Sequence, residues 1–190
     1  MASVVGICNS ALIKIGAARI TSLTEGSKNS NLCNEQYDKL RESELRGHTW
    51  NFAKTRAKLA RISGKPVSGF EYHFQLPIDF ARLITAFDND ADAGSLFYEI
   101  RGSRLLSNSS DAYITYVRNI TDPNDMDAVF REALAYRLAG ELAIPIASSG
   151  SLHDRMMRGY VAALRRAKSA DAIEDYPAQF PSSPWVTGRH

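Results

Sequence analysis

The hydrophobic pattern of this 190-residue chain changes its period twice, and this change constrains the possible folds more than any other feature. Near both ends, apolar residues recur every three or four positions, which is typical of amphipathic helices. Between them, the stretch FEYHFQL alternates strictly between apolar and polar residues, as a half-buried strand requires. The residues expected on its buried face are Phe70, Tyr72, Phe74 and Leu76. The sequence therefore predicts two helical regions separated by a β insert of residues about 51–120.

Capping and breaking residues set the expected limits of the helices. Gly16 and Gly47 are placed to end the first two helices, because glycine adopts the left-handed conformation without steric cost. Asp122 followed by Pro123 is typical of a helix start. The predicted helices span residues of about 3–16, 28–46, 123–144 and 151–173.

These elements predict an α+β fold, in which a four-helix bundle has an inserted small antiparallel β unit and an extended C-terminal tail. Residues 1–173 would form one domain, and residues 174–190 an extended arm. Three prolines exclude a helix or an inner strand from this arm: Pro177, Pro181 and Pro184. Three aromatic side chains in the arm are poorly suited to water: Tyr176, Phe180 and Trp185. The arm is therefore expected either to cover its own subunit or to dock on a partner.

Composition restricts the class of protein. Hydrophobic residues make up 44% and charged residues 23%, which is ordinary for a folded soluble domain. The net charge of +2 gives no global sign of nucleic-acid binding. Cys8 and Cys33 belong to no CxxC motif and are expected to be buried thiols, although a disulfide between them stays open. The sequence shows neither the pattern of a signal peptide nor that of a membrane span, so we expect synthesis in the cytoplasm.

No local motif for catalysis, cofactor binding or metal binding occurs. No two histidines lie three to five residues apart, so no zinc motif forms. The stretch DNDADAGSLFYE has the spacing of calcium ligands in an EF-hand, but its glycine occupies the seventh position where the sixth is required. A solvated acidic loop is the preferred interpretation, and we expect no catalytic residue, cofactor or metal ion.

The stretch HTWNFAKTRAK, which follows the expected helix stop, combines aromatic and basic residues. Trp50 and Phe52 are expected to fill the junction between the helices and the β unit. Lys54, Arg56 and Lys58 alternate with uncharged residues, so their charges should lie on one face of an extended segment. Such faces are usually solvated, sometimes bind partners and occasionally bind phosphate. No aromatic residues are interleaved with them in the sequence in the way that stacking on bases requires.

A second basic group lies on the last predicted helix. Its members are Arg155, Arg158, Arg165 and Arg166, with Lys168 beside them. The same three interpretations apply to this group, and the near-neutral total charge disfavours a dedicated DNA-binding protein.

The order of several short motifs resembles the tail tubular protein A family of short-tailed bacteriophages, which are ring-forming head-to-tail adaptors. The motifs are ARITSLTE, HTWNFA, LPIDF, YVRNITDP and LAGELAIPI, in that order and spacing. The resemblance extends from about Ser3 to Asp171. The acidic loop of residues 88–94 departs from the family pattern, and the segment after Ile173 does not align with it.

The resemblance implies a structural virion protein of the tail or neck, without enzymatic activity. Subunits of this kind form a ring of twelve that joins the portal to the tail nozzle protein and extends a channel through which DNA passes without specific binding. The residues expected at interfaces are Tyr176, Phe180, Trp185, Lys54, Arg56, Lys58, Arg155, Arg158, Arg165 and Arg166. Two alternatives stay open: a peptidoglycan hydrolase, which would need a glutamate of raised pKa near a second carboxylate, and a small nucleic-acid-binding module.

Overall fold

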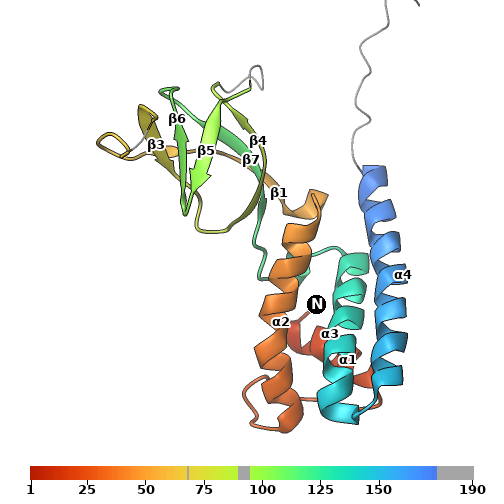
Figure 1. The fold of residues 1–190 in the computed structure, drawn as a ribbon. Coiled ribbons are helices and arrows are strands. Elements are labelled where there is room, and N and C mark those ends of the chain that lie inside the picture. The colour runs from red at the N-terminus through yellow and green to blue at the C-terminus, as the bar shows by residue number, and fades with distance from the viewer. Residues whose placement is uncertain (68, 90–94, 175–190) are drawn as a thin grey trace, which may run out of the picture.

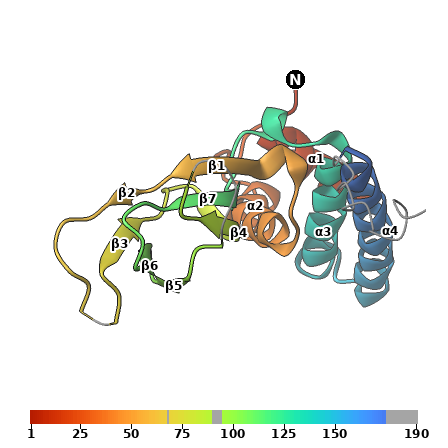
Figure 2. The same cartoon turned by 90° about the horizontal axis from the view of Figure 1, so that it is seen from above.

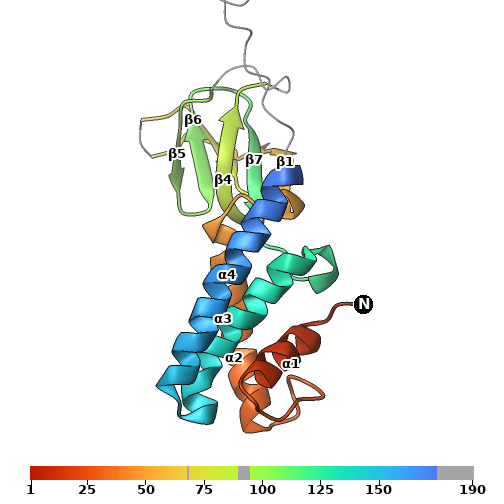
Figure 3. The same cartoon turned by 90° about the vertical axis from the view of Figure 1, so that its right-hand side faces the viewer.

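The computed structural model describes residues 1–67, 69–89 and 95–174. Within them, the chain forms a helical part and a β part that sits at one end of the helices (Figures 1 and 3). The predicted arm of residues 174–190 therefore lies outside the described residues, apart from its first residue.

Four α-helices make up the helical part. They are α1 (Val4–Lys14), α2 (Lys28–Gly47), α3 (Ala128–Ala147) and α4 (Gly150–Glu174). Side chains cap three of the N-termini, since Ser3, Ser27 and Asp127 each accept a hydrogen bond from a backbone N–H of the first turn. The start of α3 differs from the prediction because Asp122 caps a separate 3-10 turn, Pro123–Asp125, before the helix begins.

The β part consists of two antiparallel sheets. The first has the order β1 (Lys54–Lys58), β7 (Tyr113–Arg118) and β4 (Phe80–Phe87). The second has the order β2 (Ala60–Arg61), β3 (Tyr72–Gln75), β6 (Arg104–Ser107) and β5 (Tyr98–Arg101). Gly102, with φ of +58°, turns the chain between β5 and β6, and this left-handed conformation favours glycine.

The prediction of a four-helix bundle is wrong. The fold is mixed α/β: 49% of the described residues are helical and 20% lie in strands, so the β part is too large to be a small insert. The helices pack around α3, which contacts α1, α2 and α4. A bundle helix has one apolar stripe, whereas α3 buries the consecutive residues Ala133, Leu134 and Ala135, and so is covered on several sides.

Each part has its own hydrophobic core. The core of the helical part extends to the end of β7, where Val117 and Ile120 pack against residues of the helices. The core of the β part lies between the sheets and includes Phe74 and Leu76, as predicted. Phe70 and Tyr72 are only half-buried, and His73, expected on the opposite face, is buried, so the strict alternation is confirmed only in part.

Trp50 lies where the helical part meets the β part, just before a 3-10 turn, Asn51–Ala53. Its side chain is 1% exposed, which confirms the predicted burial. The ring centroid lies 5.0 Å from that of Phe130 on α3 and 5.8 Å from that of Phe52. The indole Nε1 donates a hydrogen bond to the backbone oxygen of Glu44 at 3.0 Å. The tryptophan is therefore a structural residue of the helical core.

We predict that Trp50→Ala lowers the free energy of unfolding by ~3–5 kcal/mol, because it empties a large, well-packed aromatic site. Phe97→Ala serves as the control, since the Phe97 side chain is exposed and its loss should change stability by less than ~0.5 kcal/mol. Chemical denaturation of both variants measures the difference. A change below ~1 kcal/mol at Trp50 would contradict the structural role.

Candidate protein-interaction surfaces

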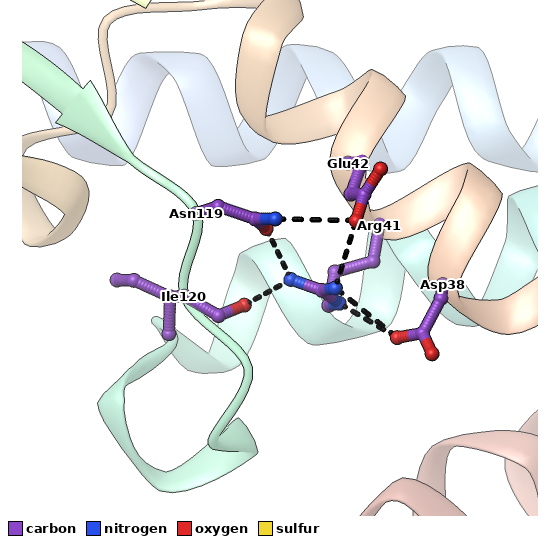
Figure 4. Close-up of polar contacts among 5 residues, drawn as sticks. All are labelled: Asp38, Arg41, Glu42, Asn119 and Ile120. Atoms are coloured by element: carbon purple, nitrogen blue, oxygen red, sulfur yellow. Dashed lines mark hydrogen bonds and ion pairs between the residues drawn. The ribbon is translucent and has the colours of Figure 1, made fainter. Parts of the chain in front are cut away.

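The buried guanidinium of Arg41 joins α2 to the segment that leads from β7 to α3 (Figure 4). Arg41 is 2% exposed, and it donates hydrogen bonds to the side-chain oxygen of Asn119 and the backbone oxygen of Ile120. It also forms an ion pair with Asp38 at 3.1 Å. Asn119 in turn donates to the carboxylate of Glu42 at 3.1 Å. A buried charge is tolerated only when it is paired in this way, so the network fixes this junction.

A second buried polar group ties the end of α4 to the start of the β part. The carboxylate of Asp171, which is 8% exposed, accepts a hydrogen bond from the backbone N–H of Asn51 at 2.7 Å. The side-chain amide of Asn51 donates to the backbone oxygen of Asp171, also at 2.7 Å. The His48 ring nitrogen Nε2 lies 3.2 Å from the same carboxylate. His48 and Asn51 therefore have a structural role, since they hold the end of α4 against the start of the β part.

Further contacts brace α2 on both sides. The Tyr160 hydroxyl on α4 donates to the carboxylate of Glu44 at 2.7 Å, and burial together with this carboxylate raises the pKa of the phenol. Arg46 donates to the backbone oxygen of Ala81 on β4 at 2.5 Å. The helices and the sheets are therefore connected by hydrogen bonds from several elements, and the surfaces below belong to one braced subunit.

The basic residues of β1 lie on the outer face of the first sheet, as predicted. Lys54, Arg56 and Lys58 are exposed and the residues between them are half-buried. Lys58 pairs with Tyr113 in the β1–β7 register and forms an ion pair with Asp111 at 2.8 Å.

Aromatic rings from other strands accompany this basic face, although none is interleaved with it in the sequence. The guanidinium of Arg56 lies 5.8 Å from the ring centroid of Phe87 and 5.9 Å from that of Tyr113. The Lys58 ammonium lies 5.2 Å from the Tyr113 centroid. The sequence could not show this because the rings come from β4 and β7, far along the chain. Cations on an edge strand also discourage unwanted strand pairing, which is an ordinary role for such residues.

The basic residues of α4 form a separate surface on the side of the helix away from α3. Arg155, Arg158 and Arg165 are exposed and repeat at helical spacing, while Met156 and Tyr160 face inward. Arg166 lies 3.5 Å from the Glu132 carboxylate of α3. Across the described ranges, no ion pair is found for Arg155, Arg158 or Arg165, so their charge faces solvent.

An acidic stripe on α2 was missed in the sequence. Glu35, Asp38 and Glu42 are exposed and stand three and four residues apart, so they line one face of the helix. α2 and α4 lie on opposite sides of α3 (Figures 1 and 2). The helical part therefore has an acidic face on one side and a basic face on the other. The spacing of the acidic residues in NEQYDKLRESE predicts a stripe on one helix face. It does not predict where that stripe lies relative to α4.

An apolar groove lies on the second sheet. One hollow of about 630 Å³ is lined by Gln75, Leu76, Pro77, Ile78, Phe80, Gly102 and Ser103. A second hollow of about 470 Å³ shares the Gly102–Ser103 turn and is lined also by Lys65, Pro66, Val67, His73, Arg101, Arg104 and Leu106. The side chains of Ile78 and Val67 are fully exposed, at 107% and 106%. We call these two adjoining hollows the turn groove.

Some features noted in the sequence lie outside the described residues, and others form no site within them. Among the described residues, no group of acidic, histidine or cysteine side chains could hold a metal ion. Part of the EF-hand-like loop, residues 90–94, lies outside that range, as do Tyr176, Phe180 and Trp185. Cys8 and Cys33 are free and buried, and the neighbouring Cys33 thiol together with burial raises the pKa of Cys8. Within the described ranges, no helix is both long and apolar enough to span a membrane.

Comparisons with known proteins assign no relative to this chain. No protein-family model matches it, and no curated protein matches it. The resemblance to phage adaptors therefore stays a prediction that depends on the motifs quoted above and on the surfaces just described.

We predict that Arg41→Met lowers the free energy of unfolding by ~1–3 kcal/mol, because the buried oxygens of Asn119 and Ile120 lose their donor. Lys39→Met is the matched control on the same helix, since the Lys39–Glu35 pair is exposed and such pairs contribute at most ~1 kcal/mol. Urea denaturation followed by circular dichroism measures both. Equal midpoints for the two variants would mean that the Arg41 network does not brace the junction.

Proposed function

We propose that this chain is a structural virion protein, a ring-forming adaptor that joins a phage portal to the tail nozzle and extends the DNA channel. The role is structural and not catalytic. The single observation that carries the proposal is the opposite charge of the two faces that flank α3. α2, which carries the acidic stripe, and α4, which carries the basic face, lie on opposite sides of α3 in one braced subunit.

A ring needs two different faces on each subunit, which meet head to tail and close by rotation. The α4 face of one copy and the α2 face of the next attract each other, because three exposed arginines face Glu35, Asp38 and Glu42. Lys39 and Arg41 on α2 offset part of this negative charge. Two α4 faces, or two α2 faces, repel each other, which disfavours a symmetric dimer through either face. The charge pattern thus favours the head-to-tail arrangement over the symmetric one.

The elongated shape leaves two ends of the subunit for other partners. In such a ring, the β part and the turn between α3 and α4 lie at opposite ends of each copy (Figures 1 and 3). One end can face the portal and the other the nozzle protein. α4 ends at Glu174, at the end of the subunit that bears the β part, and the aromatic residues of the arm follow it in the sequence.

We predict that Arg158→Glu/Arg165→Glu abolishes assembly onto the portal protein of the same phage, because the α4 face then repels the α2 face. The variant should keep the melting temperature of the unchanged chain, since both residues are exposed. Size-exclusion chromatography with light scattering measures the mass of the complex, and the wild-type complex should weaken as salt is added.

The control variant is Arg19→Glu/Arg61→Glu, which makes the same change in net charge at exposed positions outside both α2 and α4. It should assemble as the unchanged chain does. Full assembly of the α4 variant, or equal loss in both variants, would contradict the proposed contact between α4 and α2.

A small nucleic-acid-binding module is the second candidate, and the outer face of the first sheet favours it. There, Arg56 and Lys58 lie over the rings of Phe87 and Tyr113, and cations next to aromatic rings are the groups that bind single strands. However, Lys58 is already paired with Asp111, and Arg56 covers the rings on which bases would stack. This arrangement is therefore weaker evidence than the opposed helix faces.

We predict that the free chain binds duplex and single-stranded DNA only weakly, and that binding falls steeply as salt rises, because the contacts would be made to phosphate alone. Fluorescence anisotropy with labelled oligonucleotides measures both. The variant Lys54→Ala/Arg56→Ala tests whether the outer face of the first sheet binds the DNA. Nanomolar affinity at physiological salt that this variant removes would favour the nucleic-acid module over the adaptor.

A further inference from the structure

The turn groove leaves apolar surface in water that a folded subunit would ordinarily cover. Ile78 and Val67 are fully exposed and stand at the two hollows, one on each side of the Gly102–Ser103 turn. The backbone around the turn is held in place, because Leu76 donates its N–H to the Ser103 oxygen at 3.0 Å and the Gln75 side-chain amide donates to the same oxygen. The groove is thus a shaped surface that suits an extended apolar segment.

We propose that the turn groove of each copy binds the C-terminal segment Tyr176–Trp185 of the neighbouring copy. The inference rests on the proposed head-to-tail ring and identifies a second contact within it. Three aromatic residues in this segment need apolar surface, and its prolines keep it extended. Aromatic anchors in hollows commonly dominate the energy of such contacts.

The start of the segment is negatively charged and the rim of the groove is positively charged. Glu174 and Asp175 directly precede Tyr176. Lys65, Arg101 and Arg104 line the second hollow, and Arg101 is partly neutralised by Glu99, whose carboxylate lies 2.6 Å from its Nε. The remaining positive charge of the rim therefore favours the acidic end of the segment.

The order in which α4 of one copy meets α2 of the next determines which copy's groove the C-terminal segment can reach. β3, β5 and β6 lie beyond α2, on the side of the molecule away from α4 (Figures 1 and 2). A copy whose α2 packs against α4 of the first copy therefore extends its second sheet over the end of α4, where the segment begins. The segment's own groove lies on the far side of its subunit. The 16 residues after Glu174 can span at most about 58 Å, which favours the nearer groove of the neighbour.

The test mixes two variants of the full chain, one with Ile78→Cys and the other with Phe180→Cys. The native cysteines are buried in the folded chain and do not compete. Under mild oxidation, a disulfide between position 78 and position 180 forms only between copies, and mass spectrometry identifies it. We expect its yield on the portal to exceed that of a control mixture, Ile144→Cys with Phe180→Cys, on the order of tenfold, because docking holds the two thiols at high effective concentration.

Adding Tyr176→Ala and Trp185→Ala to the Phe180→Cys chain should remove most of this cross-link, because the anchors are lost. A yield equal to the control would overturn the proposal, as would a disulfide from position 180 to the portal, or one to position 78 found only when both cysteines are on one chain. The ring itself is scored separately by mass. A normal ring on the portal without the cross-link refutes the groove contact alone, and failure to form a ring on the portal refutes the adaptor itself.

Discussion

A buried arginine determines how the helices and the sheets are joined. The chain leaves α2 to build the β part and returns through Asn119 and Ile120, and Arg41 binds this returning segment back to α2. The charge of Arg41 would be costly in the core without these partners. Because Asp171 binds the outgoing segment in the same way from α4, both crossings between the two parts are held by buried polar groups. Truncating either residue would therefore leave polar atoms of the junction without partners.

The opposite faces of the helical part depend on this bracing. α2 and α4 present acidic and basic residues to solvent because α3 occupies the space between them and takes up their apolar sides. A contact between copies can use such faces only if each subunit keeps its shape, since loosely joined parts would lose entropy on assembly. In the proposed ring, the same arrangement would set the second sheet of one copy beside the end of α4 of its neighbour, so one geometry would serve both the charged contact and the arm.

The sequence allowed local structure to be predicted well and packing poorly. Periodicity and glycine stops predicted a helix over residues 28–46, and α2 ends at Gly47. Pro123 misled the prediction because it begins a 3-10 turn, and the helix starts only after Asp127. The bundle prediction failed because helix spacing alone did not show that α3 packs on several sides, against α1, α2 and α4, or that the β part forms two sheets. The structural role of Asp171 was not predicted, because Asn51, its hydrogen-bond partner, lies 120 residues away and only the tertiary fold brings the two together.

The arrangement of copies on the portal tests the account most directly, and single-particle electron microscopy of the assembled complex measures it. The account predicts a closed ring, of twelve copies as the resemblance implies, in which the arginine face of each α4 lies against Glu35, Asp38 and Glu42 of the next copy. A ring joined through other surfaces, or a chain that binds the portal without contacting a second copy, would contradict it.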